Sequence, residues 1–180
     1  PYTRALETAD AIRLATGSPA GIVPLLHEHH VEPLQSDKDE DWPFLTLTAL
    51  SERFPHFEPP ADFAFSPRWH DIPETDHAVV RRGRRVLDEI WQKYSAPPNG
   101  KPDARITLVT HGSPAGKLVM ALLGLELPQK VNVRIDNASI TIFDYHPDSK
   151  VLMASNRVDH LLHLGIDLSR QDPGYPLPKR

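Results

Sequence analysis

The chain has 180 residues, a formal net charge of −4 and no cysteine. The lack of cysteine excludes disulfide bonds and thiol catalysis, and the acidic balance disfavours nucleic acid as the main ligand. No apolar stretch approaches the roughly 18 residues of a membrane helix. We therefore expect a single soluble domain without membrane association, in a cytoplasmic or nucleocytoplasmic compartment.

The first predicted element is an amphipathic helix from Thr3 to about Ala15, which ends near Gly17. Arg4 lies in its first turn, where the helix dipole favours anions and not cations. A bound phosphate would give this cation a partner. The alternative is a solvated arginine or one that pairs with Glu7.

A short strand is predicted at Gly21–Val23, and the cluster His27-Glu28-His29-His30 follows it. Imidazoles and carboxylates are good zinc ligands, but the H-E-x-x-H pattern would need its second histidine where Val31 stands. We therefore predict no metal and no cofactor. The three histidines are expected to flank Glu28 at the rim of a cleft, or to be solvated loop residues.

The segment 32–73 is rich in proline and carries isolated aromatic residues, with one short helix expected near Leu47 to Phe54. It holds too many aromatics for a disordered linker. We predict an insertion that forms an ordered cap over the cleft and offers a surface to a protein partner. The alternative is a packed surface loop with no ligand contact.

A long helix is predicted after Glu74-Thr75, with its inward face made by Val79, Val86, Ile90 and Tyr94. The helix carries the basic run Arg81-Arg82-Gly83-Arg84-Arg85, which we interpret as a solvated face.

The most informative segment is Ile106–Thr110 with the His111-Gly112 pair that follows it. The β-branched and aliphatic run predicts a buried parallel strand, and Ala115–Leu125 predicts a helix, with Leu118, Val119, Leu122 and Leu123 on one side. His111 would then lie at the carboxyl end of a strand, beside helix amides that attract phosphate or carboxylate. The alternative is a packed or capping histidine.

Two further strands, Ser139–Tyr145 and Val151–Ser155, predict an antiparallel hairpin around His146–Ser149. The predicted fold class is α/β, a three-layer α/β/α arrangement with a central mixed, mostly parallel sheet and helices on both of its faces.

These segments resemble the histidine phosphatase superfamily, which includes the cofactor-dependent phosphoglycerate mutases. The segment from Arg4 to Ala9 is similar to the family's R-A-x-x-T-A, Leu26–Glu28 to its L-x-E, and His111-Gly112 to its second histidine. Weaker similarities are Glu74-Thr75 with Arg82, Asn137–Ile142 and Asn156–Leu161.

The resemblance implies a phosphoglycerate mutase-like fold over residues 1–180. It also implies that Arg4, His111 and Gly112 bind phosphate, that Glu28 and His111 are catalytic, with Glu28 as the proton donor, and that Arg82 points toward the core.

The chain departs from the family because no Arg-His-Gly segment, which carries the nucleophile, occurs in it. We expect this motif on a first strand before Pro1, so that the chain is an N-terminally truncated and inactive piece of the domain. The alternative is a homologue whose first strand has another sequence or is absent.

Three functions remain open. The first is a phosphomonoester hydrolase acting on a small-molecule or protein substrate through a phosphohistidine intermediate. The second is a non-catalytic phosphatase-like interaction module, as in transcription-factor or signalling subunits. The third is a phosphoglycerate mutase-type phosphotransferase, which ranks lower because the substrate-holding pattern of such enzymes is missing after Glu28.

Overall fold

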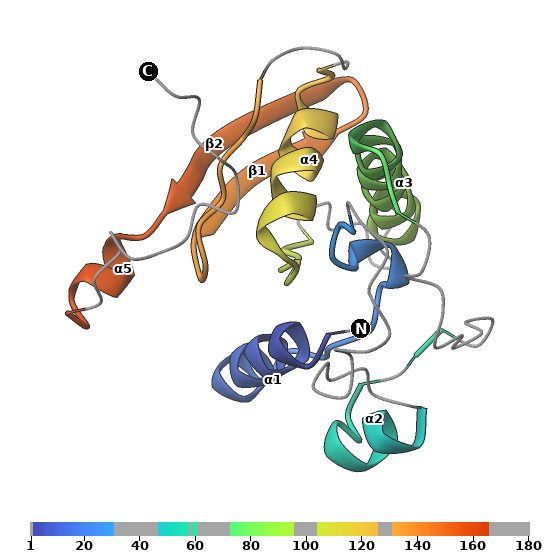
Figure 1. The fold of residues 1–180 in the computed structure, drawn as a ribbon, viewed down its shortest axis with the longest axis vertical. Helices are drawn as coiled ribbons and strands as arrows, with labels where there is room; N and C mark the ends of the chain where they lie inside the picture. Colours follow the sequence, from blue (N-terminus) through green and yellow to red (C-terminus); the bar gives the residue numbers. More distant parts are fainter. Residues whose placement is uncertain are drawn as a thin grey trace.

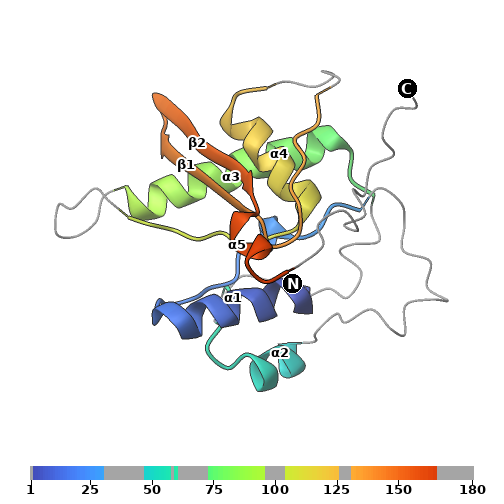
Figure 2. The ribbon, with the colours of Figure 1, turned by 90° about the vertical axis from the view of Figure 1, so that its left-hand side faces the viewer.

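The computed structural model describes residues 2–30, 47–57, 59–60, 73–95, 104–125 and 131–165. The elements in chain order are α1 (Thr3–Thr16), the 3-10 helix η1 (Pro24–Leu26), α2 (Leu47–Arg53), α3 (Asp76–Tyr94), α4 (Gly112–Leu122), β1 (Ile140–His146), β2 (Ser149–Arg157) and α5 (Asp159–Leu162). The helices α1 and α2 lie at one end of the molecule, and α3, α4 and the hairpin lie at the other (Figure 1; Figure 2).

Local signals in the sequence account for the helix boundaries. The helix α1 ends where Gly17 adopts a φ of 68° and its amide donates to the carbonyl of Arg13 at 2.8 Å. The helix α3 begins after Thr75, whose hydroxyl accepts a hydrogen bond from the amide of Ala78 at 3.3 Å. These helices and α2 confirm the predictions, whereas α4 begins at Gly112, three residues before the predicted start at Ala115.

The larger core lies between α3, α4 and the hairpin. Val86 and Met120 are completely buried, and the side chains packed around them include Phe143, Tyr145 and Leu152 from the two strands. The helices α3 and α4 approach closely at Gly83, because glycine has no side chain. A Cβ atom there would lie only 3.3 Å from the Cα of Leu118.

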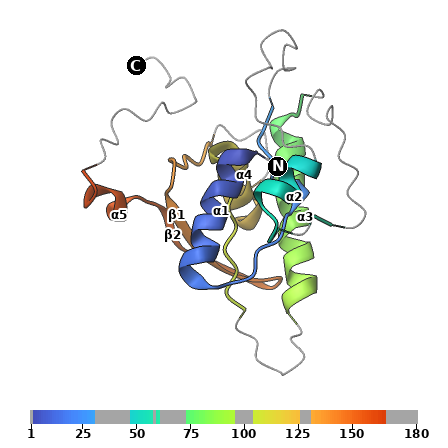
Figure 3. The ribbon, with the colours of Figure 1, turned by 90° about the horizontal axis from the view of Figure 1, so that it is seen from below.

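A second, smaller core holds α1 and α2 side by side, as the view from below shows (Figure 3). Leu6 of α1 packs there with the buried Leu50, Phe54 and Phe57. An ion pair between Glu7 and Arg53 joins the same two helices at the surface.

The strands β1 and β2 form an antiparallel hairpin that pairs Phe143 with Leu152 and His146 with Ser149, as predicted. The predicted strand at Ile106–Thr110 is not formed. Residues 104–110 belong to neither a helix nor a strand, because no described segment forms a ladder with them. Gly21–Val23 likewise is no strand of the sheet. The three-layer arrangement with a mostly parallel sheet stays a prediction.

One predicted inward position is wrong, and one residue predicted on the apolar side of a helix is exposed. Tyr94, in the last turn of α3, is 38% exposed, and Leu123, just beyond α4, is 46% exposed. Both residues lie at the C-terminal end of a helix, beyond the last buried residue of that helix. Most of the predicted 32–73 insertion lies outside the described residues. Within the described ranges, no helix is both long enough and apolar enough to cross a bilayer.

Candidate functional site

Arg4, Glu28 and His111 meet at one point although they come from three separate parts of the chain. Arg4 lies in the first turn of α1, Glu28 follows η1, and His111 immediately precedes α4. Arg4 donates a hydrogen bond from Nη2 to Glu28 Oε2 at 3.0 Å. The Nδ1 atom of His111 lies 3.4 Å from the same oxygen. One carboxylate oxygen therefore lies against both predicted phosphate-binding side chains.

The other oxygen of Glu28 is held by the backbone. Its Oε1 atom accepts a hydrogen bond from the amide of His29 at 3.0 Å. The side chain is 22% exposed, that of Arg4 is 52% exposed, and that of His111 only 5%. The carboxylate is thus held where a buried imidazole and a solvent-facing guanidinium meet.

His111 is neutral at physiological pH. Burial, reinforced by the nearby Arg4 guanidinium, lowers the pKa of His111 from its ordinary 6.5 to about 3. Its 3.4 Å approach to Glu28 is within ion-pair range, but the lowered pKa makes it a contact between a neutral ring and a carboxylate. In this state the ring carries a single N–H and can donate one hydrogen bond.

Gly112 is the first residue of α4, and its lack of a side chain admits the neighbouring segment. A Cβ atom there would lie 3.0 Å from the carbonyl oxygen of Ile135. The first amides of a helix have no partner within the helix, so this end of α4 can accept an anion. The structure thus shows a packing requirement for Gly112, and its predicted phosphate contact stays a prediction.

Tyr2 is a neighbour that sequence reasoning missed. Its ring meets His111 edge-on, with 5.0 Å between centroids and an interplanar angle of 73°. The guanidinium carbon of Arg4 lies 4.5 Å from the centre of the same ring. The hydroxyl lies 2.7 Å from His30 Nε2 in a buried hydrogen bond. No pattern in the sequence distinguishes this tyrosine from an ordinary core residue.

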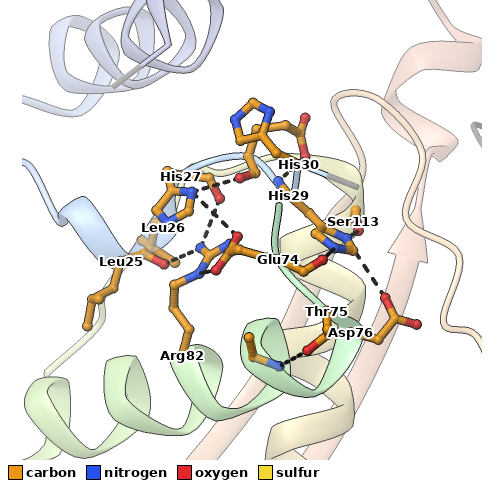
Figure 4. A network of polar contacts seen from close by, with 12 residues as sticks. Leu25, Leu26, His27, His29, His30, Glu74, Thr75, Asp76, Arg82 and Ser113 are labelled. Carbon is orange, nitrogen blue, oxygen red and sulfur yellow. Dashed lines mark hydrogen bonds and ion pairs between the residues drawn. The ribbon is translucent and has the colours of Figure 1, made fainter. Parts of the chain in front are cut away.

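The histidines beside Glu28 are not solvated loop residues, and their predicted position at the rim of a cleft stays a prediction. His29 Nε2 donates to the carbonyl of Glu74 at 3.0 Å, and its Nδ1 lies 2.9 Å from Ser113 Oγ (Figure 4). His27 Nδ1 donates to the carbonyl of Glu28 at 2.7 Å. Burial and the charge of Arg82 lower the pKa of His27 to about 4. Among the described residues, no group of three or more potential ligands is arranged to hold a metal ion.

Arg82 of α3 binds the side chain of Glu74 and the backbone of the segment that precedes Glu28. Its Nε and Nη2 atoms donate to the two carboxylate oxygens of Glu74 at 3.0 and 2.7 Å, and Nη1 donates to the carbonyls of Leu25 and His27 (Figure 4). The residue is 7% exposed, so it points toward the core and is not part of a solvated basic face. It fixes the backbone just before Glu28.

Two shallow hollows on the described surface, of about 270 and 400 Å³, are lined by none of Arg4, Glu28 and His111. The candidate site is therefore a cluster of charged and polar groups at a surface boundary, and not one of these hollows.

Comparison with known proteins identifies a family for most of the chain. A model of the histidine phosphatase superfamily (branch 1) matches residues 1–158, a range that contains Arg4, Glu28 and His111. This family has an α/β fold, in agreement with the predicted fold class. No curated protein and no solved structure matched the chain.

Proposed function

Since the chain belongs to the histidine phosphatase superfamily, we propose that Arg4, Glu28 and His111 are the phosphoryl-handling residues of a phosphomonoester hydrolase. Membership in the family supports phosphatase-type or mutase-type activity in general. The observation that carries the proposal is the position of Glu28 Oε2, an anionic oxygen 3.0 Å from Arg4 Nη2 and 3.4 Å from His111 Nδ1. A phosphoryl oxygen would meet the same two groups.

The chemistry begins with charge. A phosphate monoester carries about two negative charges near neutral pH, so its site must supply cations and hydrogen-bond donors before a nucleophile can approach. Arg4 offers a fork of N–H groups, and its 52% exposure keeps it open to an incoming anion. His111 adds a donor that strengthens its interaction as charge grows on the phosphoryl oxygens in the transition state.

Glu28 is the proposed general acid. When a phosphate displaces its carboxylate from Arg4, Oε1 stays tethered to the amide of His29. The carboxyl group then remains beside the ester, takes up a proton from solvent next to the negative charge of the phosphate, and gives this proton to the leaving alkoxide. General-acid participation of this kind accelerates a reaction by roughly 10²- to 10⁴-fold.

The nucleophile is proposed to be a histidine outside these 180 residues, because they contain no Arg-His-Gly segment. A nitrogen of that histidine would attack phosphorus in line, the phosphorus–oxygen ester bond would break, and the alkoxide would leave with the proton of Glu28. Water would then attack the phosphohistidine and release inorganic phosphate, regenerating the histidine. On this proposal the chain alone binds phosphate and does not turn over.

The test is hydrolysis of p-nitrophenyl phosphate by a protein that joins this chain to its own Arg-His-Gly segment. We expect turnover that Arg4→Ala and His111→Ala each largely abolish, whereas Arg13→Ala, a control on the same helix that breaks only a pair with Asp10, retains it. Glu28→Gln should slow an alkyl phosphate far more than this activated aryl ester. No turnover by the joined protein would contradict the hydrolase proposal.

A non-catalytic module is the second candidate, because Arg4 and His111 already lie together within these 180 residues, which contain no Arg-His-Gly segment. Arg4 and His111 would then hold a phosphorylated ligand without cleaving it. A native protein that binds inorganic phosphate, and yet forms no phosphohistidine with any phosphomonoester, would support this candidate over the hydrolase.

A further inference from the structure

We infer that Tyr2 is a positioning residue whose ring supports both Arg4 and His111 in the arrangement that receives a phosphoryl group. The inference rests on the proposed function, because it concerns the same two side chains. It assigns a role to a residue that would not itself touch the phosphate.

The ring of Tyr2 contacts the two side chains in different ways. The guanidinium of Arg4 lies over its face at 4.5 Å, within the range of a cation–π interaction. The ring of His111 meets it edge to face at 5.0 Å, a preferred geometry for aromatic pairs. A long arginine that is 52% exposed would otherwise sample many rotamers. The ring therefore restricts the rotamers that Arg4 can adopt.

The ring of Tyr2 is itself held in place by its surroundings. Tyr2 is 1% exposed, and its hydroxyl lies 2.7 Å from Nε2 of His30, which is 6% exposed. The two rings are also stacked, with centroids 5.8 Å apart at an interplanar angle of 23°. Burial raises the pKa of the Tyr2 hydroxyl above its usual range, so the hydroxyl stays protonated within this hydrogen bond. His30 lies two residues after Glu28, so this hydrogen bond connects Tyr2 to the segment that carries Glu28.

An ordinary core aromatic gives a matched control. Phe54 is 5% exposed, has the guanidinium of Arg53 at 5.5 Å from its ring centre, and meets Phe57 edge-on at 5.8 Å. It thus has the same kinds of contact as Tyr2, in the smaller core and without contact to the site. Replacing Phe54 by Leu should lower stability without changing the phosphate site.

The experiment compares Tyr2→Leu, Tyr2→Phe and Phe54→Leu in the 180-residue chain. Inorganic phosphate binding is measured by calorimetry, and the imidazole of His111 is titrated by ¹H–¹⁵N NMR. We expect Tyr2→Leu to weaken phosphate binding roughly tenfold, the size of one cation–π and one aromatic contact, and to raise the pKa of His111 toward 6.5. Tyr2→Phe keeps the ring and should stay near wild type in both measurements, as should Phe54→Leu.

The inference is overturned if Tyr2→Leu leaves phosphate affinity and the His111 titration unchanged, or if Phe54→Leu changes them equally. A wild-type chain that binds no phosphate, while Tyr2→Leu still shifts the His111 titration, would sink the proposed function and leave the positioning role standing.

If Tyr2→Leu does not fold, the inference is tested by the ring-current shift that Tyr2 causes in the NMR signals of Arg4. The side-chain protons of Arg4 should be shifted upfield in the wild type and in Tyr2→Phe, before and after phosphate is added. Unshifted Arg4 protons in these two folded proteins would overturn the inference.

Discussion

Arg4 and Glu28 form an ion pair across the candidate site, with 3.0 Å between Nη2 and Oε2. The pair joins the first turn of α1 to the segment after η1, so it links two parts of the chain 24 residues apart. It also means that the guanidinium already has an anionic partner. An incoming phosphate therefore competes with the protein's own carboxylate.

Removing the charge of Glu28 should tighten phosphate binding. Glu28→Gln leaves an amide of the same size and ends the competition for Arg4, and we expect about two- to fivefold higher affinity for inorganic phosphate by calorimetry, the scale of a partly exposed ion pair. The control is Glu7→Gln, which removes the partner of Arg53 between α1 and α2 and should leave the affinity unchanged. Weaker binding by Glu28→Gln would mean that the carboxylate organises Arg4 and does not compete for it.

The lowered pKa of His111 predicts a loss of stability in mild acid. The unfolded imidazole takes up a proton near pH 6.5, whereas the folded one does so only near pH 3, so the unfolded state binds more protons between these values. The free energy of unfolding is fully present above pH 6.5 and falls as the pH is lowered toward 3. At pH 5 the contribution of His111 amounts to about 2 kcal/mol.

His111→Asn tests this prediction, because an amide does not titrate. Urea unfolding of the variant between pH 7.5 and 5 should show about 2 kcal/mol less loss than the wild type shows. The titration of His27 should cause a loss of similar size, which the variant keeps, since the pKa of His27 is lowered to about 4. An identical pH dependence in the variant and the wild type would mean that the imidazole of His111 is accessible to protons in the folded state.

Local patterns in the sequence were enough to predict most helices and the hairpin. Thr75 and Gly17 mark the ends of two helices through cap and turn chemistry that acts within a few residues. The strand expected at Ile106–Thr110 failed for a different reason. A strand needs a hydrogen-bonded neighbour, and the described part of the chain provides none for that segment.

The sequence predicted the three candidate site residues that belong to motifs, but not the residues that contact and support them. Arg4, Glu28 and His111 could be identified because each belongs to a short motif, and the structure brings them together. Tyr2 and Ser113 belong to no such pattern. Their partners, His30 and His29, lie 28 and 84 residues away in the sequence, a relation that only the folded chain discloses.

Arg82 should be far more important for stability than the other arginines of α3. Its side chain is 8% exposed and donates to Glu74, Leu25 and His27, so Arg82→Ala leaves a partly buried carboxylate and two carbonyls without their donor. We expect a loss of about 3 to 5 kcal/mol in the free energy of unfolding, measured with urea. Arg85→Ala, which removes a 69% exposed partner of Glu89, should cost less than about 0.5 kcal/mol. Equal losses in the two variants would contradict the role of Arg82 as a buried fastening.

Gly116 should tolerate no side chain, although it lies inside α4, where alanine is normally preferred by about 1 kcal/mol. A Cβ atom there would stand 2.3 Å from the carbonyl oxygen of Val133, so α4 and the segment before β1 would have to separate. We expect Gly116→Ala to destabilise the protein by about 1 to 3 kcal/mol in urea unfolding, the usual cost of overpacking. It should also move the ¹H–¹⁵N signal of His111, because α4 begins directly after that residue. Gly21→Ala is the control, since a Cβ atom there meets nothing within 4 Å and stability should change by less than about 0.5 kcal/mol. A stabilised Gly116→Ala variant would show that helix propensity outweighs the close approach and that the segment around Val133 yields at little cost.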